Sequence, residues 1–227
     1  MEKLKTNPEK LLLLACHPKK PYWLISKQVL NMGIAGTLML DLVEAKAIDF
    51  DQKKVVVKSR PSGLTTAHEI VWKFVNERNK SRKAKRWINA LSNKASHYRK
   101  PLFHLMEQQG MLRVENHQFL FIPYLKISVS DNVTRDNLMA SLKKKVEGPE
   151  PLTTSEASLM SVVYAIKLFK PFEKKISDRK VFKKKVKQKI AENPVAEGIQ
   201  DAIQEMQAAV AAASVAAIAG SSASAGG

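Results

Sequence analysis

Apolar residues recur every three to four positions between residues 25 and 42, which is the spacing of one face of a helix. Gly33 and Gly36 lie inside the same segment, and each glycine costs a helix about 1 kcal/mol relative to alanine. That cost predicts that another backbone or a ligand approaches the helix closely here. The apolar face is formed by Ile25, Val29, Leu30, Ile34, Leu38 and Leu42.

Two β-hairpins are predicted, each directly after a helix. Short runs of β-branched or aromatic residues on either side of a polar turn are typical of hairpins. The first hairpin spans 47–57, with its turn at 51–54. The second spans 111–122, with its turn at 115–117. The two helix–hairpin units agree in order and size but not in residues.

The remaining periodic segments predict helices. Leu11 to Leu14 reads as the buried start of the first one. Thr153 with Glu156 three residues later is a capping box, and Asp178 is placed to cap a strongly basic helix. Further helices are predicted at 66–75, 82–91, 99–109, 133–146, 154–168, 179–190 and from 194 onwards.

These elements predict a mainly α fold, a single-domain helical bundle with two or three short β-hairpins. We expect an N-terminal extension at 1–9, the helical domain at 10–212 and a flexible Ala/Ser/Gly-rich tail at 213–227. No apolar run is long enough to cross a bilayer, which takes about 18 residues or more. The single cysteine, Cys16, excludes a disulfide framework and is typical of a reducing compartment such as the cytoplasm.

Charge changes the picture, because the net charge is +17, from 38 basic and 21 acidic side chains. Residues 78–100 hold nine Lys or Arg and no carboxylate, and residues 169–189 hold ten against two carboxylates. Such a field favours a polyanion, either nucleic acid or an anionic membrane surface. The alternative is that both clusters are solvated helix faces that keep the protein soluble.

Catalytic and metal-binding patterns are missing from the sequence. Gly33 and Gly36 are not followed by the Lys-Ser/Thr pair of a phosphate loop, and Cys16 reads as a buried structural thiol. We therefore expect no enzyme activity, no metal and no cofactor. The histidines are scattered at His17, His68, His97, His104 and His117.

A series of short segments in one order resembles the Golgi phosphoprotein 3 family, including its shorter bacterial relatives. The likeness covers roughly residues 10–210 and rests on the succession rather than on any one segment. The segments are a Trp-containing stretch before Gly33-Ile-Ala-Gly36, Leu38-Met-Leu-Asp-Leu42, Pro61-Ser-Gly63 before a helix, Trp87-Ile-Asn-Ala-Leu91 before a basic stretch, Gly110-Met-Leu112 at a helix end, the Phe119-Leu-Phe121 hairpin and Leu142-Lys-Lys-Lys-Val146.

The resemblance implies a peripheral membrane protein without catalysis, built around a central helical bundle. Eukaryotic members recognise phosphatidylinositol 4-phosphate with a tryptophan upstream of the glycine pair, an arginine between the glycines, and two arginines three apart on a later helix. Their apolar hairpin aids membrane insertion and self-association. The long basic N-terminal arm with which they meet vesicle coats has no counterpart in this sequence.

Carried over residue by residue, the resemblance leaves an incomplete head-group site. Ala35 stands where the family has the arginine between the glycines, and the arginine pair falls on Ser96 and Arg99. The tryptophan's position falls on Ser26, with Trp23 about one helical turn earlier. The candidate head-group residues are Trp23, Ser26, Lys27, Ser96, Arg99 and Lys100, and the membrane-contact or self-association hairpin is Phe119, Leu120 and Phe121.

The sequence thus favours a cytoplasmic, membrane-peripheral adaptor that binds anionic lipid, with a second copy and an unknown protein cargo as further partners. Arginine grips a phosphomonoester with a bidentate fork and lysine only with a point charge, so the residues present predict diffuse attraction more than stereospecific recognition. One alternative is a winged-helix-like nucleic-acid binder, since a helix followed by a hairpin beside basic helices is also found there. Another is a scaffold whose basic surface meets an acidic protein. Diffuse attraction would draw on Lys19, Lys20, Lys27, Lys80, Lys83, Lys94, Arg99 and Lys100.

Overall fold

The computed structural model describes residues 4–51, 54–60, 62–78, 82–172, 178–192, 205 and 207–215, without the side chains of residues 119, 122 and 123. The elements are α1 (Asn7–Ala15), α2 (Lys27–Glu44), β1 (Ile48–Asp51), β2 (Lys54–Val57), α3 (Thr66–Arg78), β3 (Arg82–Lys83), α4 (Ala84–Ser92), α5 (Ala95–Gln108), β4 (Leu112–Phe119), β5 (Ile122–Val129), α6 (Asn132–Glu147), α7 (Thr154–Ala165) and α8 (Arg179–Ala191).

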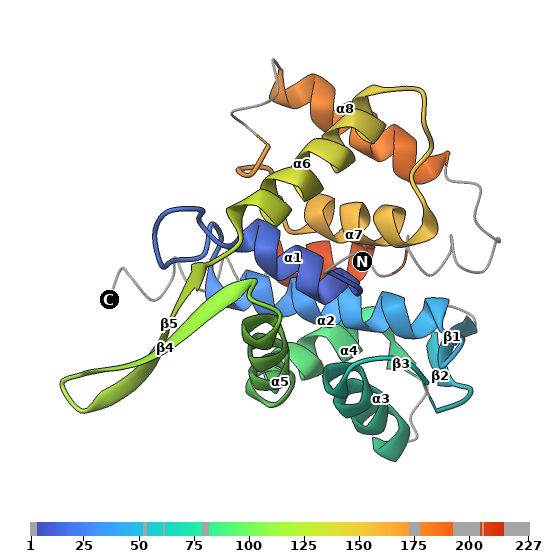
Figure 1. Ribbon diagram of the computed structural model, residues 1–227. Helices are drawn as coiled ribbons and strands as arrows, with labels where there is room; N and C mark the ends of the chain where they lie inside the picture. Colours follow the sequence, from blue (N-terminus) through green and yellow to red (C-terminus); the bar gives the residue numbers. More distant parts are fainter. Residues whose placement is uncertain are drawn as a thin grey trace, which may run out of the picture.

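Helix α2 lies at the centre of the molecule (Figure 1). It contacts α1, α3, α4, α7 and β1, so that α6, α7 and α8 lie on one side of it and α3, α4 and α5 on the other. The buried apolar residues form one cluster that runs from Leu4 to Ala213. The predicted mainly α class with short β-hairpins is confirmed.

The glycine in the middle of α2 is explained by close helix packing. A Cβ built on Gly33 would lie 3.0 Å from Ile166 Cδ1 and 3.1 Å from Leu11 Cδ2. The close neighbours are therefore side chains from α1 and from the end of α7, and not the backbone or ligand that the sequence suggested. Glycine lets three helices meet at this level of the core.

A buried polar network joins the start of α1 to α2 and α3. Asn7 donates to both oxygens of Asp41, from its backbone N at 3.1 Å and from Nδ2 at 2.7 Å. His68 Nε2 lies 3.1 Å from Asp41 Oδ2, and His68 is fully buried. Thr6 and Glu9 form a capping box directly before this point, so α1 begins within the segment expected as an extension.

The core also continues beyond residue 212 at the other end of the chain. Residues 207–215 are helical, and Ala213 and Ser214 are buried. The helix predicted from 194 onwards falls largely on 193–204, outside the described residues. The packed core thus reaches past both ends of the 10–212 range.

The first hairpin has the predicted strands and gains a third, because β3 pairs with β2 as Lys54↔Lys83 and Val55↔Arg82. This short strand delays the helix predicted from 82 until Ala84.

The turn predicted at 115–117 in the second hairpin is wrong. Strands β4 and β5 have eight residues each and pair from Leu112↔Val129 to Phe119↔Ile122. The chain reverses at Leu120 and Phe121, both with positive φ, of 44° and 66°. Such a pair forms the two-residue turn that matches strand twist, and the polar residues 115–117 lie on an exposed ribbon instead.

Candidate functional site: a cationic pocket beside the long hairpin

A pocket of about 320 Å³ lies where α2, α4, α5 and β5 meet. Four of the six residues expected to bind a head group line it: Lys27 from α2, and Ser96, Arg99 and Lys100 from α5. Helix α5 begins at Ala95 rather than at 99, so its first two turns carry all three of these side chains. We call this site the cation pocket; its other lining residues are Asn31, Ser92, Asn93, Ala95, Phe103 and Leu125.

Arg99 is the most constrained cation of the pocket. Its NH1 group donates to Asn31 Oδ1 at 2.9 Å, and its guanidinium lies over the Phe103 ring, 5.2 Å from the ring centroid. Its Nε atom is buried and has no hydrogen-bond partner among the described residues. Burial lowers the pKa of Arg99, but a guanidinium remains charged at neutral pH.

Trp23 and Ser26 support the pocket from outside its lining. The Trp23 ring stacks on Phe103 with centroids 5.9 Å apart, and Phe103 in turn lies under Arg99. Ser26 caps α2, because its Oγ accepts from the backbone N of Val29 at 3.3 Å. Trp23 therefore orders the aromatic wall, and Ser26 orders the helix start that carries Lys27.

The rim of the pocket is open to solvent and bears unneutralised charge. Lys27, Ser96 and Lys100 are exposed, and neither lysine forms an ion pair within the part of the chain that the structure describes. The first turn of α5 also faces the pocket through Ala95 and Ser96, and its cap residue Lys94 makes no side-chain cap. A helix N-terminus with three cations beside it attracts an anion.

The family model for Golgi phosphoprotein 3 (GPP34) matches residues 8–206, which is most of the chain. The chain belongs to the Golgi phosphoprotein 3 family. No curated protein matches it.

The resemblance to the Golgi phosphoprotein 3 family implies a pocket arginine between the two glycines of α2, and this chain has Ala35 at that position. Ala35 is fully buried in α2 and cannot present a charge to solvent. Asn31, one turn earlier on the same helix, faces the pocket and holds Arg99. Sequence reasoning missed Asn31, although an amide inside a strongly apolar helix was a signal that could have pointed to it.

The β4–β5 hairpin of this family member projects away from the helices (Figure 1). Leu125 of β5 lines the pocket, and the turn at the far end exposes Leu120 by 75% and Phe121 by 90%. Tyr124 stacks on His117 across the ribbon, with centroids 5.6 Å apart. Two large apolar side chains thus stand at the point of the hairpin furthest from the core. The third predicted hairpin residue, Phe119, lies in β4, and its side chain is outside the described set.

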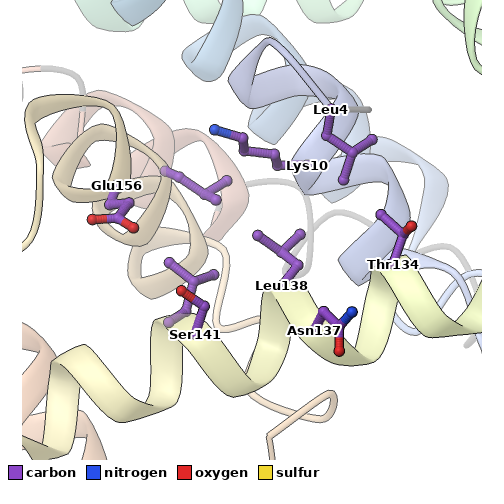
Figure 2. A pocket seen from close by; sticks show the side chains of 9 residues that line it. Leu4, Lys10, Thr134, Asn137, Leu138, Ser141 and Glu156 are labelled. Atoms are coloured by element: carbon purple, nitrogen blue, oxygen red, sulfur yellow. The ribbon is translucent and has the colours of Figure 1, made fainter. Parts of the chain in front are cut away.

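A second pocket, of about 270 Å³, lies between α1, α6 and α7 (Figure 2). Its floor is leucine, from Leu4, Leu138, Leu142 and Leu159, and its rim is polar. Glu156 on this rim is bound to Lys145 Nζ at 2.8 Å. With one lysine, Lys10, and one engaged carboxylate, this pocket has little charge for an anionic head group.

Within the described ranges no cluster of His, Cys, Asp and Glu has the arrangement of a metal site. Thr65 Oγ1, His68 and Asp41 form a hydroxyl–imidazole–carboxylate chain, with 2.8 Å from Oγ1 to His68 Nδ1. The His68 ring is fully buried, and its Nδ1 atom also accepts a hydrogen bond from the backbone N–H of Thr65. These hydrogen bonds therefore stabilise the start of α3. Burial raises the pKa of the Cys16 thiol to about 12, as expected for a structural cysteine.

No helix among the described residues combines the length and apolarity that a bilayer span requires.

Proposed function

We propose that this member of the Golgi phosphoprotein 3 family is a non-catalytic peripheral membrane protein that binds the phosphate head group of an anionic phospholipid in the cation pocket. The observation that carries the proposal is the meeting of Lys27, Ser96, Arg99 and Lys100 around one open pocket. Lys27 comes from α2 and the other three from the first two turns of α5, and each of the four is polar or cationic. The proposed location is the cytoplasmic surface of a membrane.

The chemistry of the pocket supports a phosphate ligand held mainly by charge. Lys27 and Lys100 offer point charges at the rim, whereas Arg99 has one edge engaged by Asn31. Phosphatidylinositol 4-phosphate, or another lipid with a similar phosphate head group, supplies several acceptor oxygens for these donors. With one arginine in place of the family's three, we expect affinity to follow membrane charge more than head-group stereochemistry.

The hairpin supplies the second contribution to membrane binding. Leu120 and Phe121 are exposed beyond the pocket, where insertion into the acyl boundary buries apolar surface that water otherwise covers. Self-association through the same tip is the alternative use of these side chains. A charged pocket combined with an apolar tip gives the two signals that stable peripheral binding requires.

Nucleic-acid binding of the winged-helix type needs an exposed helix before the hairpin, and α2 is the first helix in such a position. Helix α2 is buried along nearly its whole length and packs against elements on both sides, so it is not available to a groove of DNA. We therefore keep duplex DNA only as an arm of the experiment.

The test is co-sedimentation of the purified protein with vesicles of neutral lipid, of neutral lipid plus phosphatidylserine, and of neutral lipid plus phosphatidylinositol 4-phosphate at matched surface charge. The variant Lys27→Gln/Lys100→Gln should weaken binding to anionic vesicles about 30-fold, at about 1 kcal/mol per charge. The control Lys54→Gln/Lys58→Gln removes the same charge from exposed positions on and beside β2 and should change little. Equal pelleting with neutral vesicles, equal losses in both variants, or tighter binding to duplex DNA than to any vesicle would each overturn the proposal.

A further inference from the structure

Helix α8 is strongly basic, and its lysines fall into an exposed set and a set that contacts the rest of the protein. Its thirteen residues contain no carboxylate. Phe182, Val186 and Ile190 are buried against the core, and Asp178 caps the helix through the backbone N–H groups of its first turn. On the opposite face Lys180, Lys184 and Lys187 are exposed, at successive spacings of four and three. We call these three residues the lysine ridge.

The other lysines of this region are engaged by the protein itself. Lys189 Nζ donates to the Glu150 carbonyl at 2.8 Å, and Lys183 lies over the Phe169 ring, 5.0 Å from its centroid. On the neighbouring helix α6, Lys144 and Lys145 pair with Glu150 and Glu156. The lysine ridge differs from both sets, because none of its three ammonium groups has an ion-pair partner among the residues that the structure describes.

The ridge is electrostatically unfavourable for the isolated protein. Lys180 and Lys184 are like charges one turn apart, which destabilises a helix. Lys180 also lies in the first turn, where the helix dipole disfavours a cation. The buried apolar face and the Asp178 cap already account for the helix without these lysines. An anion bound along the ridge would remove both unfavourable terms.

We propose that the lysine ridge is a docking site for an acidic α-helical segment of another protein. An α-helix laid along α8 presents carboxylates at spacings of four and three with the same pitch as the ridge, so three ion pairs form in register. Val181, which is 50% exposed beside the ridge, adds an apolar contact for that helix. Acidic carboxylates on a helical pitch complement this row in both charge and spacing.

Nucleic acid fits the ridge less well. Tight binding to a duplex neutralises many phosphates, about 6–10 in typical cases, whereas the ridge offers one row of three lysines. The exposed face of α8 carries no aromatic side chain on which a base could stack and no ridge arginine to form a fork. Helix α8, which carries the ridge, lies at the opposite end of the molecule from α5 (Figure 1), and α5 lines the cation pocket, so docking here does not depend on lipid binding.

The experiment uses the full-length protein and a fluorescent synthetic peptide. The peptide is an Ala-based helix with Glu at spacings of four and three and one Leu beside them; its matched control has the same composition in scrambled order. Anisotropy titrations at low salt should show binding of the patterned peptide, a clearly weaker response to the scrambled one, and loss of affinity as salt is raised. No measurable binding of the patterned peptide, or equal binding of both peptides, overturns the proposal.

Variants then locate the contact. Lys180→Gln/Lys184→Gln/Lys187→Gln should weaken peptide binding about tenfold or more, which is the factor that three exposed ion pairs supply together. Lys54→Gln/Lys58→Gln/Lys83→Gln removes the same net charge from exposed positions in and beside β2 and β3 and should leave affinity within about twofold. Equal losses in both variants would show a net-charge effect and overturn the site.

Circular dichroism confirms that each variant is folded, and pelleting with anionic vesicles should be equal for the ridge variant and the wild type. A ridge variant that instead loses vesicle or duplex RNA binding, while keeping its affinity for the peptide, would assign the ridge to that polyanion and overturn the acidic-helix proposal. Failure of lipid binding in the wild type leaves the peptide titration unaffected, so the two proposals are tested separately.

Discussion

Replacing the turn of the long hairpin should raise stability and lower membrane affinity together. Leu120 and Phe121 both have positive φ, which costs about 1–2 kcal/mol for a residue with a Cβ. Asn followed by Gly is the preferred pair for this type of turn, so Leu120→Asn/Phe121→Gly should stabilise the protein by about 2 kcal/mol. For a protein of this size that corresponds to a rise in melting temperature of about 4–8 °C.

The same double variant removes the apolar tip. Burying a leucine or phenylalanine side chain is worth about 1.5–3 kcal/mol each, and these two are 75% and 90% exposed in the free protein. Loss of both should weaken binding to anionic vesicles at least about 100-fold.

The assays are thermal unfolding by circular dichroism and vesicle co-sedimentation. Val133→Ser serves as the control, because Val133 is 71% exposed at the start of α6 and not at the hairpin tip. A double variant that melts lower refutes the reasoning on backbone strain. One that still pellets like the wild type refutes insertion of the tip.

The remaining predictions concern stability. His68→Ala should lower the free energy of unfolding in urea by about 3 kcal/mol, because it leaves Asp41 buried without its imidazole partner. Gly33→Leu should destabilise the protein by about 3 kcal/mol or more in the same assay, since even a Cβ at this position lies 3.0 Å from Cδ1 of Ile166, the residue directly after α7. Burial alone would raise the pKa of Glu156, but hydrogen bonds from Lys145 and Thr153 outweigh it and hold the pKa below its usual value. This carboxylate therefore stabilises the fold above its unfolded pKa, and the contribution is lost as pH falls through the lower folded pKa, so Glu156→Gln should flatten the fall in melting temperature below about pH 5.

Helix positions were predictable wherever one apolar face and a cap coincided in the sequence. The capping box of Thr153 and Glu156 and the Asp178 cap both appear as expected. The turn of the second hairpin was not predictable, because the polar residues 115–117 of an exposed two-stranded ribbon look like a turn in sequence. A turn made by Leu120 and Phe121 carries neither glycine nor asparagine, and so gives no local signal.

The candidate site was predictable in part. The sequence alone indicates Lys27, Ser96, Arg99 and Lys100 as head-group candidates, and the structure places all four around one pocket. Asn31 and Leu125 join them only through tertiary packing of α2 and β5 against α5, which no local pattern encodes. The same limit applies to Gly33, whose neighbours come from residues 11 and 166.

The central place of α2 has a consequence for how the molecule comes apart. The helices on both sides of α2 pack against it and share one buried core. If the helices on one side are removed, those on the other side no longer have a complete core. Fragments produced by cutting the chain between residues 110 and 150 should therefore be insoluble when made singly and recover structure only when mixed. In native-state hydrogen exchange, the α2 amides should open only with global unfolding.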